Sequence, residues 1–221
     1  LPVEKICALA KQAGIVSIID AAHSPGQIPV DLQSLDADVV FGNCHKWMLS
    51  PKGAAFLYVR RELQHLAEPL IVSWGYQATE EMTTGSRFVD LLQWTGTKDP
   101  AAALSVPAAI QFMQEQNWDR VRSECHALLR ETLERICDLM GLPPLYELDS
   151  AFYGQMGVAA LPRSNLMVLK KRLYDEYRIE VPLIEWNDMR LIRVSIQAYN
   201  DRRDADALLD ALKSLLPQVA L

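Results

Sequence analysis

Lys46 lies between two apolar runs in the segment Val39–Val59, VVFGNCHKWMLSPKGAAFLYV. His45 precedes it, Trp47 follows it, and a proline–lysine–glycine turn comes a few residues later. A lysine that only keeps a surface soluble rarely has this many large apolar and aromatic neighbours. If its amine is kept neutral and aimed at a carbonyl carbon, such a lysine can act as a nucleophile.

The cofactor that most often uses such a lysine is pyridoxal 5′-phosphate (PLP), whose aldehyde the amine holds as a Schiff base. PLP chemistry also needs a carboxylate at the pyridine nitrogen, because the protonated ring is the electron sink. Asp20, at the end of the apolar run Ile15–Asp20, is placed for that role. The phosphate group needs donors such as hydroxyls, an imidazole or the amides at a helix start.

Three short apolar runs predict the sheet that positions these groups: IVSIID ending at Asp20, DVVFGN ending at Asn43, and GAAFLYV after the turn. Their β-branched residues are apolar on both faces, which is typical of a sheet covered on each side. Ligands of open α/β sheets bind beyond the carboxyl ends of the strands. Asp20 and the segment Asn43–Lys46 both follow such ends.

A second module is predicted after this α/β region. We expect residues 1–100 to form part of a large α/β domain with a mostly parallel sheet, 101–125 a linking helix, and 126–221 a smaller α+β domain. The smaller domain should contain strands near QMGVAAL, IEVPLI and LIRVSIQ. Its helices are predicted to begin after an N-cap at Ser164 and at Asn200 or Asp201. The polar stretch Tyr76–Val89 is predicted to be a mobile loop.

The composition argues against several function classes. The net charge of −6 does not fit a protein that binds a nucleic-acid backbone through a basic face. No apolar run approaches the ~20 residues of a membrane span. The four histidines and four cysteines show no metal-ligand spacing, so we expect no metal, and free thiols in a reducing cytoplasm. Because the sequence opens at Leu1 within a helical pattern, we expect it to be the later part of a longer chain.

The segment Asp20–Arg60, DAAHSPGQIPVDLQSLDADVVFGNCHKWMLSPKGAAFLYVR, resembles the cofactor-lysine region of class V aminotransferases. The resemblance is strongest to the branch that includes isopenicillin N epimerase, which is related to the cysteine desulfurases. QWTGTKDP and RVSIQAYN are similar to later signatures of that family, in the same order. The resemblance covers nearly all 221 residues. It implies the C-terminal part of a PLP-dependent transferase of fold type I, with residues 1–100 in the PLP-binding domain.

The resemblance implies a role for each matching residue near the lysine. Lys46 forms the Schiff base, and Asp20 pairs with the pyridinium nitrogen. The side chain of His23 meets the ring hydroxyl, at a position where related cysteine desulfurases often have glutamine. Asn43 and His45 lie where the family makes phosphate contacts, although a serine is common at the position of Asn43. Asp20 could otherwise be an ordinary turn residue, and His23 a loop histidine.

Two further matches involve a second subunit and the substrate. Gly96 and Thr97 match the loop that reaches the phosphate of the neighbouring subunit's cofactor, which implies a homodimer; Thr97 could instead cap the next helix. Arg193 matches the arginine that binds the α-carboxylate of an amino-acid-like substrate, a task suited to a bidentate guanidinium. Arg193 lies in an apolar strand, where an arginine without a partner is costly to bury, so a functional role is favoured.

The resemblance leaves epimerisation, transamination, β-elimination and desulfuration open. Each usually begins with loss of the substrate α-proton to the lysine acting as general base. Cysteine desulfurases carry a nucleophilic cysteine shortly before the carboxylate-binding arginine. The segment Arg178–Ile192 contains no cysteine, so desulfuration is disfavoured. The alternative to an enzyme is a non-catalytic or truncated domain that keeps the fold but lacks the N-terminal half of the site.

Overall fold

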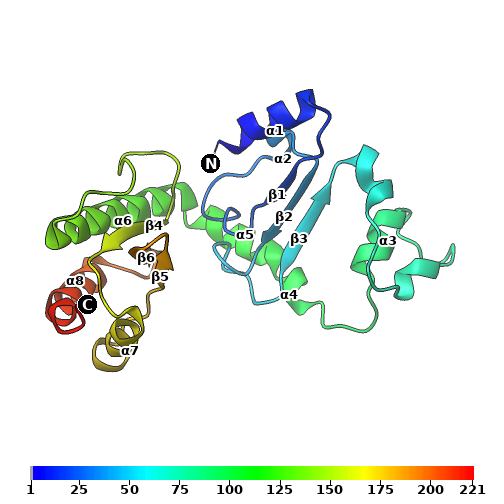
Figure 1. Cartoon of the computed structure of the whole chain (residues 1–221). Coiled ribbons are helices and arrows are strands. Elements are labelled where there is room, and N and C mark those ends of the chain that lie inside the picture. The colour runs from blue at the N-terminus through cyan, green and yellow to red at the C-terminus, as the bar shows by residue number, and fades with distance from the viewer. Residues whose placement is uncertain (1) are drawn as a thin grey trace. The chain divides into compact units, whose positions relative to one another are not determined.

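The computed structural model describes residues 2–221 as two compact units, which meet between Gln114 and Glu115. The boundary falls within the predicted linking stretch 101–125. That stretch holds several helical pieces: α4 (Ala101–Leu104), α5 (Val106–Glu115) and the start of α6 (Trp118–Met140). Asn117 separates α5 from α6 with a left-handed backbone, φ +49°. Figure 1 shows the helices and strands of both units.

The first unit is built on a sheet in the order β1-β2-β3, with β1 parallel and β3 antiparallel to β2. The strands and their helices are α1 (Val3–Gln12), β1 (Ile18–Asp20), α2 (Leu32–Leu35), β2 (Val39–Asn43) and β3 (Ala55–Val59). Gly14, with φ +66°, follows the end of α1, where a left-handed glycine commonly ends a helix. The Asp31 carboxylate begins α2 by accepting hydrogen bonds from two amides of its first turn.

Only one face of this sheet is well covered by the residues described. Val40 is fully buried, and Ile19, Phe56 and Tyr58 pack beside it in the small core that includes Cys7 of α1. The other face, defined by strand alternation, carries Ile18, Phe41 and Leu57, which are 65%, 39% and 45% exposed. We expected both faces of this sheet to be covered, but the described residues cover only one of them well. Apolar runs alone do not say what covers each face.

The chain after β3 forms three short elements: η1 (Arg61–Leu66), η2 (Trp74–Gln77) and α3 (Arg87–Gln93). The predicted loop Tyr76–Val89 contains parts of two of them. The buried carboxylate of Asp90 organises it by accepting hydrogen bonds from the hydroxyls of Thr83 (2.5 Å) and Thr84 (2.7 Å). These bonds hold the pKa of Asp90 below its usual range. Ser86 caps α3 by accepting from the amide of Val89.

The second unit packs helices on an antiparallel sheet in the order β4-β6-β5. Its further elements are β4 (Met156–Leu161), α7 (Leu166–Tyr177), β5 (Leu183–Trp186), β6 (Met189–Ser195), α8 (Arg202–Leu215) and η3 (Leu216–Gln218). Leu129 and Leu133 of α6, Leu169 of α7, Ile192 of β6 and Leu212 of α8 are fully buried in one core. The alternation of β4 and β6 supplies one face of that core.

Two predicted helix starts can be compared with the structure. Asp201, one of the two predicted positions, is the N-cap of α8. Its side chain forms a capping box with Asp204. The N-cap of α7 is Asn165 rather than Ser164, because the Asn165 side chain accepts from the Val168 amide. Ser164 is buried and its hydroxyl donates to the carbonyl of Pro162. Within residues 2–221, no helix is both long and apolar enough to span a membrane.

Candidate active site

Lys46 lies on the loop that joins β2 to β3, shortly after β2 ends at Asn43. Two backbone hydrogen bonds close the base of this loop. The Cys44 amide donates to the Ala54 carbonyl at 3.0 Å, and the Ser50 amide donates to the Cys44 carbonyl at 3.2 Å. The lysine is therefore displayed at the carboxyl end of β2, on a short turn whose two ends are fixed.

The same turn contains strained backbone at Leu49, whose φ is +62°. A left-handed conformation costs a non-glycine residue about 1–2 kcal/mol. Leucine lacks the short polar side chain with which asparagine or aspartate offsets that cost. Such strain persists only where the surroundings enforce it, and it clusters at functional sites. The strain indicates that the shape of the Lys46 turn is tightly enforced.

A chain of side-chain contacts connects Lys46 to the loop after β1. The Lys46 Nζ lies 3.3 Å from His23 Nε2, and the indole Nε1 of Trp47 donates to His23 Nδ1 at 3.1 Å. Trp47 is buried, whereas His23 and Lys46 are exposed. The structure thus brings together two of the predicted site residues, and both ring nitrogens of His23 are engaged by neighbouring residues of the Lys46 turn.

Asp20 is the last residue of β1, as predicted. Its Oδ1 accepts a hydrogen bond from the Ala22 amide at 2.9 Å, which orients the carboxylate at the strand end. The parallel register pairs Asp20 with Phe41, so Asp20 and Asn43 belong to the same face and the same edge of the sheet. No ion pair within residues 2–221 involves Asp20 or Lys46.

Asn43 and His45 flank the buried Cys44 just before the lysine. Asn43 ends β2 opposite Ala55 and is partly buried. His45 Nδ1 lies 3.0 Å from the Ala54 carbonyl, an acceptor, so this nitrogen carries the proton. The contact fixes the ring to β3 and leaves Nε2 as the nitrogen available to a ligand. Burial raises the pKa of the Cys44 thiol and keeps it neutral.

Gly96 and Thr97 lie in the turn before α4. Gly96 has φ +100°, and a Cβ there would lie 3.3 Å from the Trp74 ring, so glycine suits both the backbone and the packing. Thr97 is exposed and does not cap the next helix, because α4 begins after Pro100 and the Asp99 carboxylate binds its first amide. The alternative role of Thr97 as a helix cap is therefore wrong for this structure.

Arg193 lies in β6 of the second unit, opposite Val158 of β4. Its Nε is buried and has no hydrogen-bond partner among the described residues, and no acidic side chain among them pairs with its guanidinium. A guanidinium nitrogen buried without a hydrogen-bond partner is costly, and an anionic ligand would satisfy it. The observation fits the predicted role, which needs a carboxylate supplied from outside the described chain.

Trp47 and Gly26 were not singled out as site residues by the sequence. A Cβ on Gly26, whose φ is +86°, would lie 2.4 Å from the Trp47 carbonyl oxygen, so only glycine permits this approach. The loop after β1 therefore packs directly on the Lys46 turn. A proline–glycine pair is typical of a turn, but it does not indicate which part of the chain the turn will contact.

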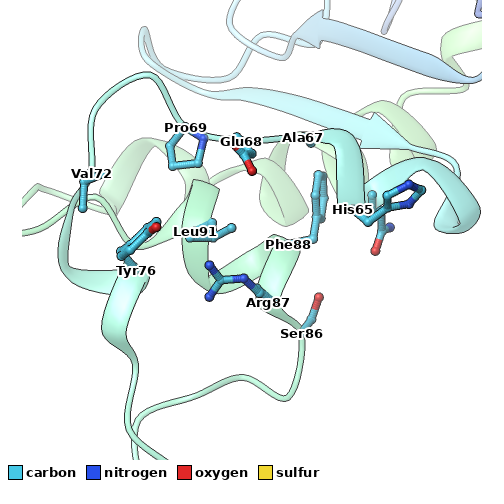
Figure 2. Close-up of a pocket in the computed structure, with 11 residues that line it drawn as sticks. His65, Ala67, Glu68, Pro69, Val72, Tyr76, Ser86, Arg87, Phe88 and Leu91 are labelled. Atoms are coloured by element: carbon cyan, nitrogen blue, oxygen red, sulfur yellow. The ribbon is translucent and has the colours of Figure 1, made fainter.

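A hollow of about 400 Å³ lies elsewhere in the first unit, between η1, η2 and α3 (Figure 2). The Arg87 guanidinium lies 5.3 Å from the centre of the Tyr76 ring, and both residues line the hollow beside Phe88 and Glu68. None of its described lining residues is a predicted site residue. The chemistry of the lysine turn is therefore separate from this hollow. No cluster of metal-ligating side chains occurs in the part of the chain that is described.

Comparisons with known proteins decide the family. The sequence model of the family described as Aminotransferase class-V matches residues 1–149. This chain belongs to that family. Isopenicillin N epimerase from Amycolatopsis lactamdurans is 33% identical over 97% of this chain and 56% of its own length. Hercynylcysteine sulfoxide lyase from Schizosaccharomyces pombe is 34% identical over 63% of this chain and 36% of its own.

Solved structures share the fold of this chain. The apo structure of a cysteine desulfurase from Thermococcus onnurineus NA1 superposes with a TM-score of 0.80 at 21% identity, covering 98% of this chain and 56% of that one. The predicted fold type I is confirmed. Class-V aminotransferases and cysteine desulfurases are PLP-dependent. The present class-V chain spans about half the length of the relatives it matches.

Proposed function

We propose that this class-V protein is a PLP-dependent enzyme that acts on an amino acid or a similar small amine through Lys46. The observation that carries the proposal is an amine and a carboxylate, neither with a charged partner within residues 2–221, at the carboxyl ends of adjacent parallel strands. Both side chains are exposed, so neither needs a charged partner to offset burial and both are open to a ligand. Here both groups are held in place by neutral contacts instead.

The donor set fits PLP. Lys46 would hold the aldehyde carbon covalently, and Asp20 has a carboxylate oxygen left to accept a hydrogen bond from the protonated ring nitrogen. Asn43 and the Nε2 of His45 would contact the phosphate, and His23 the ring hydroxyl. When bound, PLP supplies an electron sink that stabilises negative charge at the substrate α-carbon.

Asp20, Lys46 and Arg193 would then each have a definite task. The Asp20 carboxylate would keep the ring nitrogen protonated, because it is a fixed negative charge oriented by the Ala22 amide. The Lys46 amine would be the base that takes the α-proton of the substrate. Arg193 would bind the substrate carboxylate, supported by its buried Nε without a partner.

Epimerisation of an amino-acid centre is the reaction we favour, supported by the similarity to an isopenicillin N epimerase over nearly the whole chain. Elimination is the second candidate, supported by the similarity to a sulfoxide lyase over part of it. Desulfuration has less support. All four cysteines are buried, and none lies between Arg178 and Ile192, so the described residues present no exposed thiol nucleophile.

A homodimer is also proposed. Gly96 and Thr97 match a loop that serves the neighbouring subunit in the resembling family, and Leu70 and Ile71 of the preceding segment are 103% and 81% exposed. Apolar side chains exposed next to each other are typical of contact surfaces. Sedimentation of the cofactor-loaded gene product tests this; an active monomer would contradict it.

The test of the proposed function is chemical labelling of the lysine. The whole gene product is mixed with PLP, reduced with borohydride and mapped by peptide mass, with Lys46→Ala and Lys52→Ala as paired variants. Wild type and Lys52→Ala should absorb at roughly 400–430 nm and carry the label on Lys46. Lys46→Ala should lose both signals. A label on Lys52, or no specific label, would contradict the proposal and favour a non-catalytic domain.

A further inference from the structure

The ring of His23 is held by two residues that are adjacent in the chain. Trp47 Nε1 donates to Nδ1 at 3.1 Å, and Lys46 Nζ lies 3.3 Å from Nε2. An indole N–H can only donate, so Nδ1 of His23 must act as the acceptor. A neutral imidazole with an accepting Nδ1 carries its proton on Nε2. An imidazolium would place an N–H against the indole N–H, so the contact disfavours it.

The tautomer has a consequence for Lys46. An Nε2–H pointing at Nζ makes a hydrogen bond only if Nζ accepts, which requires the neutral amine. An ammonium in the same place would set donor against donor. The neutral amine is the form that attacks a carbonyl carbon or takes a proton. With the other tautomer, an accepting Nε2 would instead stabilise the ammonium.

Packing keeps the three groups in this arrangement. Trp47 is 8% exposed, and the backbone of Gly26 lies against its carbonyl at a distance that excludes any side chain. The side chain of Gln27, also buried, donates to the His23 carbonyl at 2.9 Å. The loop after β1 is thus tied to the Lys46 turn through backbone packing as well as through the ring, so the imidazole has little freedom to reorient.

We propose that Trp47 is a positioning residue: its indole N–H holds His23 in the Nε2–H tautomer and aims that proton at the amine of Lys46. The inference rests on the proposed role of Lys46 and adds a residue to it. The same Nε2–H would be the donor toward the ring hydroxyl of PLP, so one tautomer serves the site both before and after the cofactor binds.

The test is the protonation of His23 in the cofactor-free protein, read from the nitrogen-15 signals of its ring and assigned with His23→Gln. Wild type should show Nε2 protonated and Nδ1 bare. Trp47→Phe keeps the aromatic ring but removes the donor, and should shift His23 to a mixture with Nδ1–H or the imidazolium. Trp118→Phe, which removes another buried indole, is the matched control and should leave the His23 signals unchanged.

A second readout follows the amine itself. At fixed pH and PLP concentration, borohydride trapping at Lys46 should be slower in Trp47→Phe by roughly three- to tenfold, the worth of one hydrogen bond. If wild-type His23 carries its proton on Nδ1, or if Trp47→Phe leaves the ring signals unaltered, the proposal is overturned; the wild-type spectrum decides even if the variant does not fold. A correct tautomer combined with no label on Lys46 would overturn the proposed function and leave the positioning role intact.

Discussion

The two ends of the β1–β2–β3 sheet carry charged residues in opposite states. Where β1 and β2 begin, Asp38 accepts from the Ser17 amide at 2.9 Å, the Ser17 hydroxyl at 3.1 Å and Arg60 Nε at 3.0 Å. Arg60 also reaches Asp36 at 2.7 Å, and Lys11 pairs with the same carboxylate. Each of these four charged groups has an opposite charge beside it.

At the carboxyl end the charged groups are not neutralised. Asp20 accepts one backbone hydrogen bond, and the contact made by Lys46 is with His23, which brings no opposite charge in its neutral form. Both ends belong to one small sheet. The end with paired charges therefore holds β1, β2 and β3 together. The end with unpaired charges leaves the Asp20 and Lys46 side chains available for a ligand.

The largest expected effect is catalytic and belongs to the carboxyl end. Asp20→Asn keeps the size and the bond to Ala22 but removes the charge that would hold the proton on the ring nitrogen. In cofactor-saturated gene product, deuterium exchange at the substrate Cα should fall by ~10²–10⁴, equivalent to ~3–5 kcal/mol of lost transition-state stabilisation. Exchange at the wild-type rate would mean that Asp20 is only a turn residue.

The next effect is on stability and belongs to the paired end. Asp38 is 16% exposed at its side chain, and Asp38→Asn removes its ion pair with Arg60 while leaving a partly buried guanidinium. We expect the free energy of unfolding in urea to fall by about 1–3 kcal/mol. Asp149→Asn is the control, because the Arg130–Asp149 pair is highly exposed and should contribute at most ~0.5 kcal/mol. Equal losses in the two variants would argue against a special role for Asp38.

A smaller effect concerns how the free energy of unfolding changes at acidic pH. The amide and hydroxyl of Ser17 and the charge of Arg60 hold the pKa of Asp38 below 3.8 in the folded protein. A carboxyl group whose folded pKa is depressed contributes stability above its unfolded pKa and loses it as the pH falls through the folded value. Unfolding free energy should therefore drop as the pH is lowered below about 4. The drop should be shallower in Asp38→Asn than in wild type.

The smallest effect concerns backbone strain, which both ends contain in different forms. At the paired end the left-handed residue is Asp36, φ +50°, a type that tolerates this conformation; at the carboxyl end it is Leu49, φ +62°. Leu49→Gly should relieve ~1–2 kcal/mol of strain and lose ~0.5–1 to chain entropy, a net gain near 0.5 kcal/mol. Leu145→Gly is the matched control, because Leu145 is 41% exposed like Leu49 but has no positive φ; it should show only the loss.

The sequence predicted the two strand ends at Asp20 and Asn43, because strand ends can be read locally. The run before Asp20 and the run before Lys46 each become a strand, and parallel pairing puts their ends together. The roles of the residues there remain predictions. The contact of Trp47 with His23 could not be predicted, because it depends on how a loop folds back over a turn. Ser164 and Asn165 are adjacent, and either side chain could cap α7. Which of the two caps the helix depends on the packing of Ser164, which the sequence does not show.

The central claim is that the two ends of one sheet divide stability and chemistry between them. The most direct measurement takes Asp20→Asn and Asp38→Asn of the whole gene product and determines, for each, both the Cα deuterium-exchange rate with cofactor saturating and the unfolding free energy without it. Asp20→Asn should lose ~10²–10⁴ in exchange with stability within ~0.5 kcal/mol of wild type, and Asp38→Asn should lose stability while exchanging within about threefold of wild type. A loss of exchange rate in both variants, or a loss of stability in both, would contradict this division between the two ends.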